Sequence, residues 1–583
     1  MNFVDISNLN ITTELEVLKR DTQRYSSFLY QHKGVFFADN KRIGNNDSEE
    51  AKTKFINVLT KAKEENVSLV LSPEYSCPKS VIDDIIANPE LQPSQQKIWA
   101  LGGESLNKEE LKYFKDLQNV NIHIHFENCY DISDKNYVDP LYYIFKGKHN
   151  GDDKLIILIQ FKTSHMGGLW SSQTEPDNII EGDTIYIIKN NNQSVRLMSF
   201  ICSEAMNFTA QYEPQLIQHH NWLDSPYLML SLQFNPNPSH PNFIAFKQFV
   251  LSNERRELIS LNWGFSTTIF GKGALYAENN APRSGIYFKT SDTELDYKKD
   301  KIINNHKKGL YFLQIKREKR VYFLNRDIEL FKIHNKSVHI IEGVDEQRRR
   351  EGPTVSNIYL LDDTFNILEI LGDIPDNHIR FLTKQGVSNT YFLDSTKSVI
   401  DKEILLNIST GKVKPKEGNK WSDIINLNSF SLNEADECNN RLTYLEDTYV
   451  NSETNRSNYC SSIIELDNNI LPNNSLYPHS LKRFKYKDLK LAFSNDASDY
   501  SYLYNVVNES NEIQKATICY LGYASDRDIE HTFDELQKLF EKGTVGIDTI
   551  VVYYKRGNSI LEKSIPDAAA ITKTPTNHNS ITE

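Results

Sequence analysis

The sequence predicts an α/β fold spread over more than one domain. Apolar runs typical of buried strands alternate with amphipathic segments typical of helices, and this alternation favours a sheet covered by helices. The chain has 583 residues, which is more than one hydrophobic core usually serves. We therefore expect two or three domains with ample capacity to bury apolar surface.

Composition limits the kinds of partner. The 66 basic and 78 acidic residues give a net charge of −12, and the basic clusters at 316–320 and 348–350 are short. A broad electrostatic contact with nucleic acid is therefore not expected. The six cysteines form no C-x-x-C pair, which favours a reducing compartment. Because we find neither an apolar leader nor a membrane-length apolar run, we expect a cytoplasmic protein that does not enter a membrane.

The first half of the chain begins with residues 1–30, which we predict to be a polar helical extension. Four strands and two helices then follow, and the first strand after a helix ends on Glu74. The strands are predicted at 34–40, 68–74, 97–104 and 120–128, and the helices at 49–65 and 108–117.

Further strands deliver polar residues at their ends. The run LIILIQFK ends on Lys162, and the run beginning at Val195 ends on Cys202. Strands are also predicted at 181–188, 226–234, 258–263, 309–315 and 320–325, and a helix at 243–257. Since sites form where strand ends and their loops converge, Glu74, Lys162 and Cys202 are expected to meet.

Cys202 is the candidate nucleophile. It follows an apolar strand and precedes Ser203 and Glu204, a pattern that predicts a strand-to-helix turn with the sulfur exposed at the sheet edge. Backbone N–H groups at the start of a helix stabilise a thiolate or an oxyanion. The alternative is a buried structural cysteine, because free cysteines are usually buried.

The C-terminal part of the chain has its own organisation. Charged residues, Gly343, Gly352 and Pro353 place a domain boundary near 335–352. Short strands follow at 357–362 and 367–371, then an Asn-rich middle. The run ATICYLGY, a helix from Asp528 and the run DTIVVYY predict a strand-helix-strand unit. We predict a C-terminal α/β domain of unknown fold over 350–566, and a disordered tail over 567–583.

A cysteine that attacks a carbon bonded to nitrogen requires a base and a group that stabilises the oxyanion. Glu74 and Lys162 are residues of the right type, because a carboxylate accepts the thiol proton and a compact ammonium concentrates charge on one oxygen. Taken singly, each is equally compatible with an ordinary charge at a strand end.

These segments resemble the carbon-nitrogen hydrolase, or nitrilase, superfamily over about residues 30–330. LSPEYSCP, FKTSHMGG and FICSEAM are similar to its three motifs, in order. The resemblance implies that Glu74 is the general base, Lys162 the oxyanion-stabilising lysine and Cys202 the nucleophile, with the backbone N–H of Ser203 as a second oxyanion donor. It further implies that Glu175 orients the lysine.

The resemblance also implies a four-layer α-β-β-α sandwich over residues 31–335, with no metal or organic cofactor, and often a homodimer or larger assembly. GGE at 102–104 fits the family pattern, and Glu254 and Asn262 are weaker correspondences. The sequence departs from the pattern in two places. Lys162 and His165 are separated by two residues rather than one, and the segment after Cys202 lacks the usual arginine, aromatic residue and proline.

Other patterns predict different chemistry. His123 and His125 alternate on one strand and could bind a metal, although no third ligand follows at a suitable spacing. Ser76 and Lys79 have the spacing of an acyl-transfer serine and its base. His219 and His220 follow Cys202 and would allow a Cys-His arrangement, which leaves Glu74 and Lys162 unused. No phosphate-binding glycine motif is present in the sequence.

From these observations we expect a thiol amidohydrolase that acts on a small-molecule amide or nitrile. The alternative is a scaffold that keeps the nitrilase-like body for oligomerisation and uses the C-terminal domain to sense or bind a protein partner, as in bacterial defence systems. The C-terminal extension of more than two hundred residues motivates this alternative.

Overall fold

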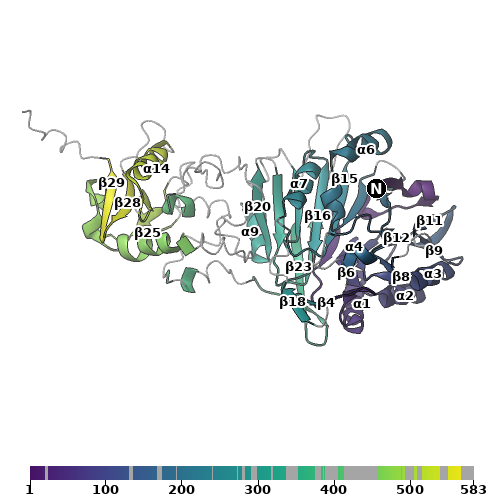
Figure 1. Ribbon diagram of the computed structural model, residues 1–583. Coiled ribbons are helices and arrows are strands. Elements are labelled where there is room, and N and C mark those ends of the chain that lie inside the picture. The colour runs from purple at the N-terminus through teal and green to yellow at the C-terminus, as the bar shows by residue number, and fades with distance from the viewer. Residues whose placement is uncertain are drawn as a thin grey trace, which may run out of the picture. The chain divides into compact units, whose positions relative to one another are not determined.

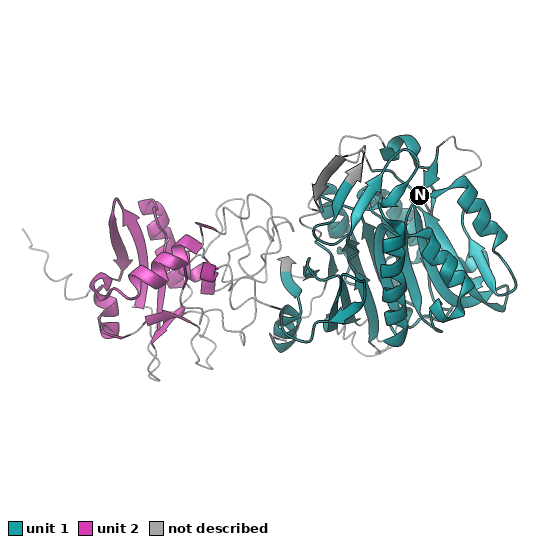
Figure 2. Cartoon of the chain, turned by 90° about the horizontal axis from the view of Figure 1, so that it is seen from below, with its two compact units in different colours: residues 1–374 teal, residues 375–583 magenta. Residues whose placement is uncertain are grey.

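The chain divides into two compact units, residues 1–374 and 375–583 (Figure 2). The computed structural model describes residues 1–19, 24–129, 135–166, 174–191, 194–238, 240–271, 274–278, 283–289, 299–316, 319–335, 352–374, 382–384, 386–387, 405–411, 457–458, 460–487, 489–492, 504–508, 515–538 and 549–565. The boundary expected near 335–352 lies inside the first unit, because strands on both sides of it pair with each other.

The first unit contains two large mixed sheets (Figure 1). In the described residues the first sheet has the order β1-β13-β14-β15-β16-β19-β21-β20, with β14, β15 and β16 parallel. Its strands are β1 (Asn2–Asp5), β13 (Thr184–Ile188), β14 (Arg196–Ile201), β15 (Tyr227–Gln233), β16 (Arg256–Asn262), β19 (Gly285–Lys289), β20 (Leu310–Lys316) and β21 (Lys319–Leu324).

The second large sheet has the order β24-β23-β22-β3-β6-β7-β11-β12-β9 in the described residues, and β2 also pairs with β11. Strands β3, β6 and β7 are parallel, whereas β11 is antiparallel to both β7 and β12. The strands are β2 (Ile11–Thr12), β3 (Tyr25–Tyr30), β6 (Leu69–Cys77), β7 (Ile98–Gly103), β9 (Ile122–His125), β11 (Pro140–His149), β12 (Asp152–Phe161), β22 (Leu330–Asn335), β23 (Thr354–Leu361) and β24 (Ile367–Glu369).

Helices cover the second sheet because they bury one apolar face against it. Phe55 and Val58 of α1, Ile82 of α2 and Leu111 of α3 share a core with the strands of that sheet. The α-helices of the unit are α1 (Ser48–Glu64), α2 (Lys79–Ala87), α3 (Lys108–Asp116), α4 (Thr174–Asn178), α5 (Glu204–Asn207), α6 (Glu213–His220), α7 (Pro241–Val250) and α9 (Lys299–Lys307).

The remaining elements of this unit are short. One small sheet has the order β18-β17-β4-β5, and β8 pairs with β10. Their bounds are β4 (Val35–Ala38), β5 (Ile43–Asn45), β8 (Leu106–Asn107), β10 (Tyr137–Val138), β17 (Thr268–Gly271) and β18 (Ala274–Glu278), and the 3-10 turns are η1 (Ile6–Leu9), η2 (Glu16–Leu18), η3 (Pro89–Leu91) and η4 (Ala210–Tyr212).

Buried polar contacts join the two large sheets. Gln160 of β12 donates to the carbonyl of Ser199 in β14 and accepts from the N–H of Tyr186 in β13. At the ends of the strands, the indole N–H of Trp263 donates to the carbonyl of Glu74 at 2.6 Å. The carboxyl end of β6 therefore lies beside the end of β16, where the candidate residues gather.

Three expectations about the elements are wrong. The N-terminal residues form β1, η1, β2 and η2 rather than a helix, because Leu15 and Leu18 are fully buried and the N–H of Leu15 donates to Asn190. The helix expected at 243–257 ends at Val250, and its last residues turn into β16. Strand β11 was not predicted, although it lies between β7 and β12.

The second unit contains the predicted strand-helix-strand segment, with β27 (Lys515–Tyr520) and β28 (Ile550–Arg556) parallel on either side of α14 (Asp526–Lys538). Its described sheet has the order β25-β26-β27-β28-β29. The other elements are β25 (Leu489–Leu491), β26 (Val506–Asn508), β29 (Ser559–Ser564), the π-helix η7 (Glu465–Ile470) and the 3-10 turns η8 (Asn474–Leu476) and η9 (His479–Phe484). The expected tail, 567–583, and much of the Asn-rich middle lie outside the described residues.

None of the helices that the structure describes is both long and apolar enough to cross a membrane.

Candidate active site

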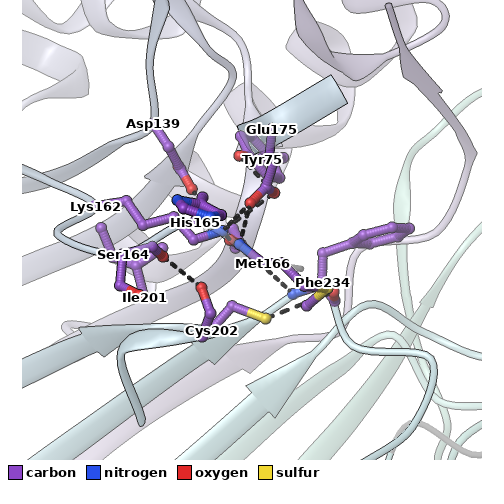
Figure 3. Close-up of polar contacts among 12 residues, drawn as sticks. Tyr75, Asp139, Lys162, Ser164, His165, Met166, Glu175, Ile201, Cys202 and Phe234 are labelled. Carbon is purple, nitrogen blue, oxygen red and sulfur yellow. Dashed lines mark hydrogen bonds and ion pairs between the residues drawn. The ribbon is translucent and has the colours of Figure 1, made fainter. Parts of the chain in front are cut away.

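Lys162 is the central charge of a fully buried polar cluster between the two sheets (Figure 3). It follows β12 directly, and its side chain contacts two glutamates that come from distant parts of the chain. Its Nζ lies 2.6 Å from Glu74 Oε1 and 3.0 Å from Glu175 Oε2. The chain therefore brings together three of the residues that the sequence analysis selected.

Glu74 is carried by an irregular part of β6. The pairing of β6 with β7 shifts register between Ser72 and Cys77, and Tyr75 has a positive φ of 59°. Gly102 of β7 makes room for this irregularity, since a Cβ there would lie 2.2 Å from the carbonyl oxygen of Pro73 and 2.7 Å from Glu74 Cα. The glycine after the IWAL strand is thus required for the close approach of two backbones.

Glu175 holds the lysine from the other side. It lies in α4 and is 1% exposed. Besides Lys162, its carboxylate accepts hydrogen bonds from the Tyr75 hydroxyl at 3.0 Å and from the N–H of Met166 at 2.7 Å. These contacts give Lys162 a fixed direction, as an oxyanion-stabilising lysine requires.

Cys202 occupies a strained turn between β14 and the four-residue helix α5. Its φ is 40°, a left-handed value that costs a non-glycine residue roughly 1–3 kcal/mol. The sulfur is not exposed as the sequence predicted: the residue is 0% exposed, and its thiol points to the carbonyl oxygen of Phe234, 3.7 Å away. Strain at a cysteine next to ionisable groups is typical of a functional position.

Glu74 lies near the cysteine as well as the lysine. After burial, its carboxyl is the strongest influence on the pKa of the Cys202 thiol. The second oxygen of Glu74 accepts the N–H of Phe234 at 2.7 Å. Phe234 therefore lies between the two groups, with its N–H on the carboxylate and its C=O near the thiol.

Burial and charge set the protonation of the cluster. Burial raises the pKa of Cys202 well above its usual range, and the carboxylate of Glu74 raises it further. Burial also raises the pKa of Glu74, although the ammonium of Lys162 opposes this shift. Burial lowers the pKa of Lys162, but Glu175, Glu74 and Asp139 together raise it well above the usual value. The resting site thus combines a neutral thiol with a charged lysine.

Three groups in the cluster were not predicted. Asp139 precedes β11, is 0% exposed and places Oδ2 3.6 Å from Lys162 Nζ. Phe234 ends the strand expected at 226–234, and it contacts the cluster through its backbone N–H and C=O. Glu204 accepts the N–H groups of Thr163 and Ile201, each at 2.6 Å. Asp139 could have been found from the sequence only through the strand that follows it, which the sequence analysis did not recognise.

The other residues that the family resemblance selected have contacts outside the lysine cluster. The hydroxyl of Ser203, the residue after Cys202, donates to the carbonyl of Ser164. The ring of His165 pairs with Glu181. Glu254 lies in the turn before β16 rather than in a helix. Asn262 ends β16 as expected, and its side-chain oxygen accepts the N–H of Trp263 at 2.9 Å.

The competing patterns do not form the sites that their spacing suggested. Ser76 donates to the carbonyl of Pro73, whereas Lys79 pairs with Asp83, so they do not act on each other. His123 and His125 share a side of β9, and His123 stacks on His149 with 3.6 Å between ring centroids. Within the described ranges, no three His, Cys, Asp or Glu side chains are arranged to hold a metal ion.

The histidines after Cys202 also have other neighbours. The ring of His220 lies edge-on to Phe3, with 6.4 Å between their centroids. The thiol of Cys202, by contrast, points to the C=O of Phe234, whose N–H donates to Glu74. Cys202 and Glu74 therefore share a neighbour, whereas the ring of His220 lies against Phe3.

Comparisons with known proteins give structural neighbours only. No family model matches the chain, and no curated protein matches it. A glutamine-dependent NAD+ synthetase from Acinetobacter baumannii matches with a TM-score of 0.26 and 11% identity, over 47% of this chain and 46% of the synthetase. The match thus spans less than half of that protein. A mutant amidase of the nitrilase superfamily from Nesterenkonia AN1 matches with a TM-score of 0.25 and 12% identity, over 46% of this chain and 84% of the amidase.

Proposed function

We propose that this protein is a thiol amidohydrolase that hydrolyses a non-peptide carbon-nitrogen bond in a small amide or nitrile. In this proposal residues 31–335 have the four-layer α-β-β-α arrangement of the nitrilase superfamily, and the chain self-associates as a dimer or larger assembly in the cytoplasm. The C-terminal unit is then free to bind a protein partner.

One observation carries the proposal. The carboxyl of Glu74 lies 2.6 Å from the ammonium of Lys162, and it shares a neighbour with Cys202: the N–H of Phe234 donates to Glu74, and the thiol points to the C=O of Phe234. A base must come within hydrogen-bond reach of the proton that it takes, and an oxyanion donor must lie near the attacking atom. A buried carboxylate placed between the lysine and the cysteine supports both roles.

The proposed acylation starts when Glu74 takes the proton of Cys202. The thiolate attacks the carbonyl carbon of the amide, and the C=O electrons move to oxygen. The ammonium of Lys162 and the backbone N–H of Ser203 stabilise this oxyanion. When the tetrahedral intermediate collapses, Glu74 gives its proton to the departing nitrogen, so that the C–N bond breaks and a thioester remains on Cys202.

Deacylation repeats these steps with water. Glu74 takes a proton from the water, whose oxygen attacks the thioester carbon, and Lys162 again stabilises the oxyanion. The C–S bond breaks, the cysteine sulfur is protonated again and the carboxylic acid leaves. Every proton moves through Glu74 in this mechanism, which explains why this residue lies near both Cys202 and Lys162.

The test of the mechanism is Cys202→Ala. Release of ammonia or amine from a panel of amides and nitriles should fall to background, because no other group forms the thioester. Cys519→Ala is the matched control, since Cys519 is equally buried but lies in the second unit. Circular dichroism should show that both variants fold. Full turnover by Cys202→Ala would eliminate the mechanism.

The scaffold hypothesis is retained for one reason, which is the complete burial of the Cys202 sulfur. Iodoacetamide distinguishes the two hypotheses. An enzyme should be alkylated at Cys202, and Glu74→Gln should slow the reaction because the base is lost. A scaffold should leave Cys202 unmodified at every pH at which the protein stays folded.

A further inference from the structure

Asp139 is an acidic residue within the site that the proposed mechanism does not use. It lies between β10 and β11, opposite the lysine, and its backbone C=O accepts the N–H of Lys162 at 2.9 Å. Backbone pairing thus fixes Asp139 beside Lys162. Its side chain is 0% exposed and points into the same cluster (Figure 3).

The contacts of Asp139 do not suit an ionised carboxylate. Its closest oxygen is 3.6 Å from Lys162 Nζ, beyond hydrogen-bond distance, whereas Glu74 and Glu175 approach the same nitrogen to 2.6 and 3.0 Å. Among the described residues, neither oxygen of Asp139 accepts a hydrogen bond from an N–H or O–H group. A buried carboxylate without donors is costly, so an ionised Asp139 would be unstable here.

The neighbour that Asp139 does have is another carboxyl group. Asp139 and Glu74 both face Lys162 Nζ, at 3.6 and 2.6 Å, and after burial Glu74 is the strongest influence on the pKa of Asp139. Since an ionised carboxylate only accepts hydrogen bonds, two carboxyl groups can form one only when a proton lies between them. Glu74 already accepts from Lys162 and from the N–H of Phe234, both of which favour its ionised form.

The charges around Asp139 also favour its protonated form. It faces Glu74 on β6, Lys162 after β12, Glu175 on α4 and the hydroxyls of two tyrosines, Tyr75 and Tyr137. Two of these groups are carboxylates and only one is a cation. A third negative charge would therefore be unbalanced. Burial and the neighbouring Glu74 raise the pKa of Asp139 well above its usual range.

We propose that Asp139 is a positioning residue that stays protonated and donates its O–H to Glu74, which holds Glu74 as the anionic base beside Cys202. The inference rests on the proposed function for its catalytic meaning, but the protonation itself does not depend on it. A donor on Glu74 stabilises its charged form. The hydrogen bond also fixes which way the carboxylate faces.

Two substitutions separate this role from a purely structural one. Asp139→Asn keeps the shape and an N–H donor without the ionisable proton. Asp139→Leu keeps a similar volume but removes the donor. Asn should retain kcat near neutral pH, and Leu should lower kcat by about 10- to 100-fold with little change in KM, as expected for the loss of a hydrogen bond to a charged group.

The pH profile adds a readout that packing does not affect. In the parent protein, ionisation of Asp139 at high pH adds a negative charge beside Glu74 and ends the donated hydrogen bond. The alkaline fall in kcat from this ionisation should be absent in Asp139→Asn. Equal loss of kcat in both variants, or an unchanged alkaline limb in Asp139→Asn, would overturn the positioning role.

Infrared spectroscopy tests the protonation without any substrate. The difference spectrum between the parent protein and Asp139→Asn at neutral pH should contain the C=O stretch of a protonated carboxylic acid. A difference that contains only carboxylate bands would overturn the inference. Because this result does not require turnover, it stands even if Cys202→Ala shows that the proposed function is wrong. It also decides the question if Asp139→Leu does not fold.

Discussion

At the scale of single residues, Glu204 connects the two strand ends that carry the lysine and the cysteine. One oxygen of its carboxyl accepts the N–H of Thr163, the residue after Lys162, and the other accepts the N–H of Ile201, the residue before Cys202. The side chain is 0% exposed. Glu204 therefore fixes the distance between the proposed oxyanion donor and the nucleophile.

Glu204 should make stability depend on pH. Burial raises its pKa from 4.5 to about 7, although the two backbone N–H groups oppose this shift. The unfolded chain loses the proton as the pH passes about 4.5, whereas the folded protein keeps it until about 7. The contribution of Glu204 to the free energy of unfolding is thus fully present below pH 4.5 and is lost as the pH rises to 7.

The measurement is the free energy of unfolding of the parent protein and of Glu204→Gln at several pH values. Gln accepts one of the two N–H groups but cannot ionise. The stability advantage of the parent protein should shrink between pH 4.5 and 7 by on the order of 3 kcal/mol. An advantage that stays constant over this range would show that Glu204 is ionised throughout.

At the scale of elements, the close contact between β6 and β7 positions Glu74, the proposed general base. A side chain at Gly102 would overlap the backbone of Pro73 and Glu74. Gly102→Ala should therefore displace Glu74 and destabilise the fold by roughly 1–3 kcal/mol or more. Gly372→Ala is the control, because a Cβ at Gly372 meets nothing within 4 Å.

Thermal unfolding and turnover measure the two consequences separately. Gly102→Ala should lower both the melting temperature and kcat, whereas Gly372→Ala should change neither by much. If Gly102→Ala behaves like its control, the backbone contact does not position Glu74.

The sequence predicted strands best where apolar runs end on a polar residue. Cys202 and Lys162 follow strands that formed within a few residues of their expected bounds. Asp139 was missed because PLYYIFKGKH was not recognised as a strand, and no local pattern reveals that β11 lies between β7 and β12. The sequence left the burial of Cys202 as an alternative and could not decide it, since the thiol faces Phe234, which is distant in sequence.

The prediction of an N-terminal helix was wrong for a related reason. Its polar residues fit a surface helix, but Leu15 and Leu18 are buried by contacts with residues near 190. Such tertiary contacts override weak local preference. The domain boundary was similarly displaced, because β22 and β23, on either side of the expected boundary, pair with each other.

At the scale of the whole molecule, each unit encloses its own apolar cores in the described residues. Clusters that include Trp99 and Trp263 take their members from residues 1–374. Clusters that include Leu481 and Phe533 take theirs from residues 375–583. Every residue of the candidate site belongs to the first unit.

Two truncations test whether the first unit folds and carries the site alone. A fragment of residues 1–374 keeps β23 and β24, whereas a fragment of residues 1–335 loses both. Tyr359 of β23 is fully buried and packs against Phe28 with 5.9 Å between ring centroids. The shorter fragment should therefore unfold at a lower temperature, since the loss of several buried side chains costs several kcal/mol. The longer one should melt close to the first transition of the full chain and should be alkylated at Cys202 as fast as the full chain.

Equal stability of the two fragments would show that β23 and β24 are not part of the first unit. Loss of Cys202 reactivity in a folded 1–374 fragment would mean that the second unit is needed for the site.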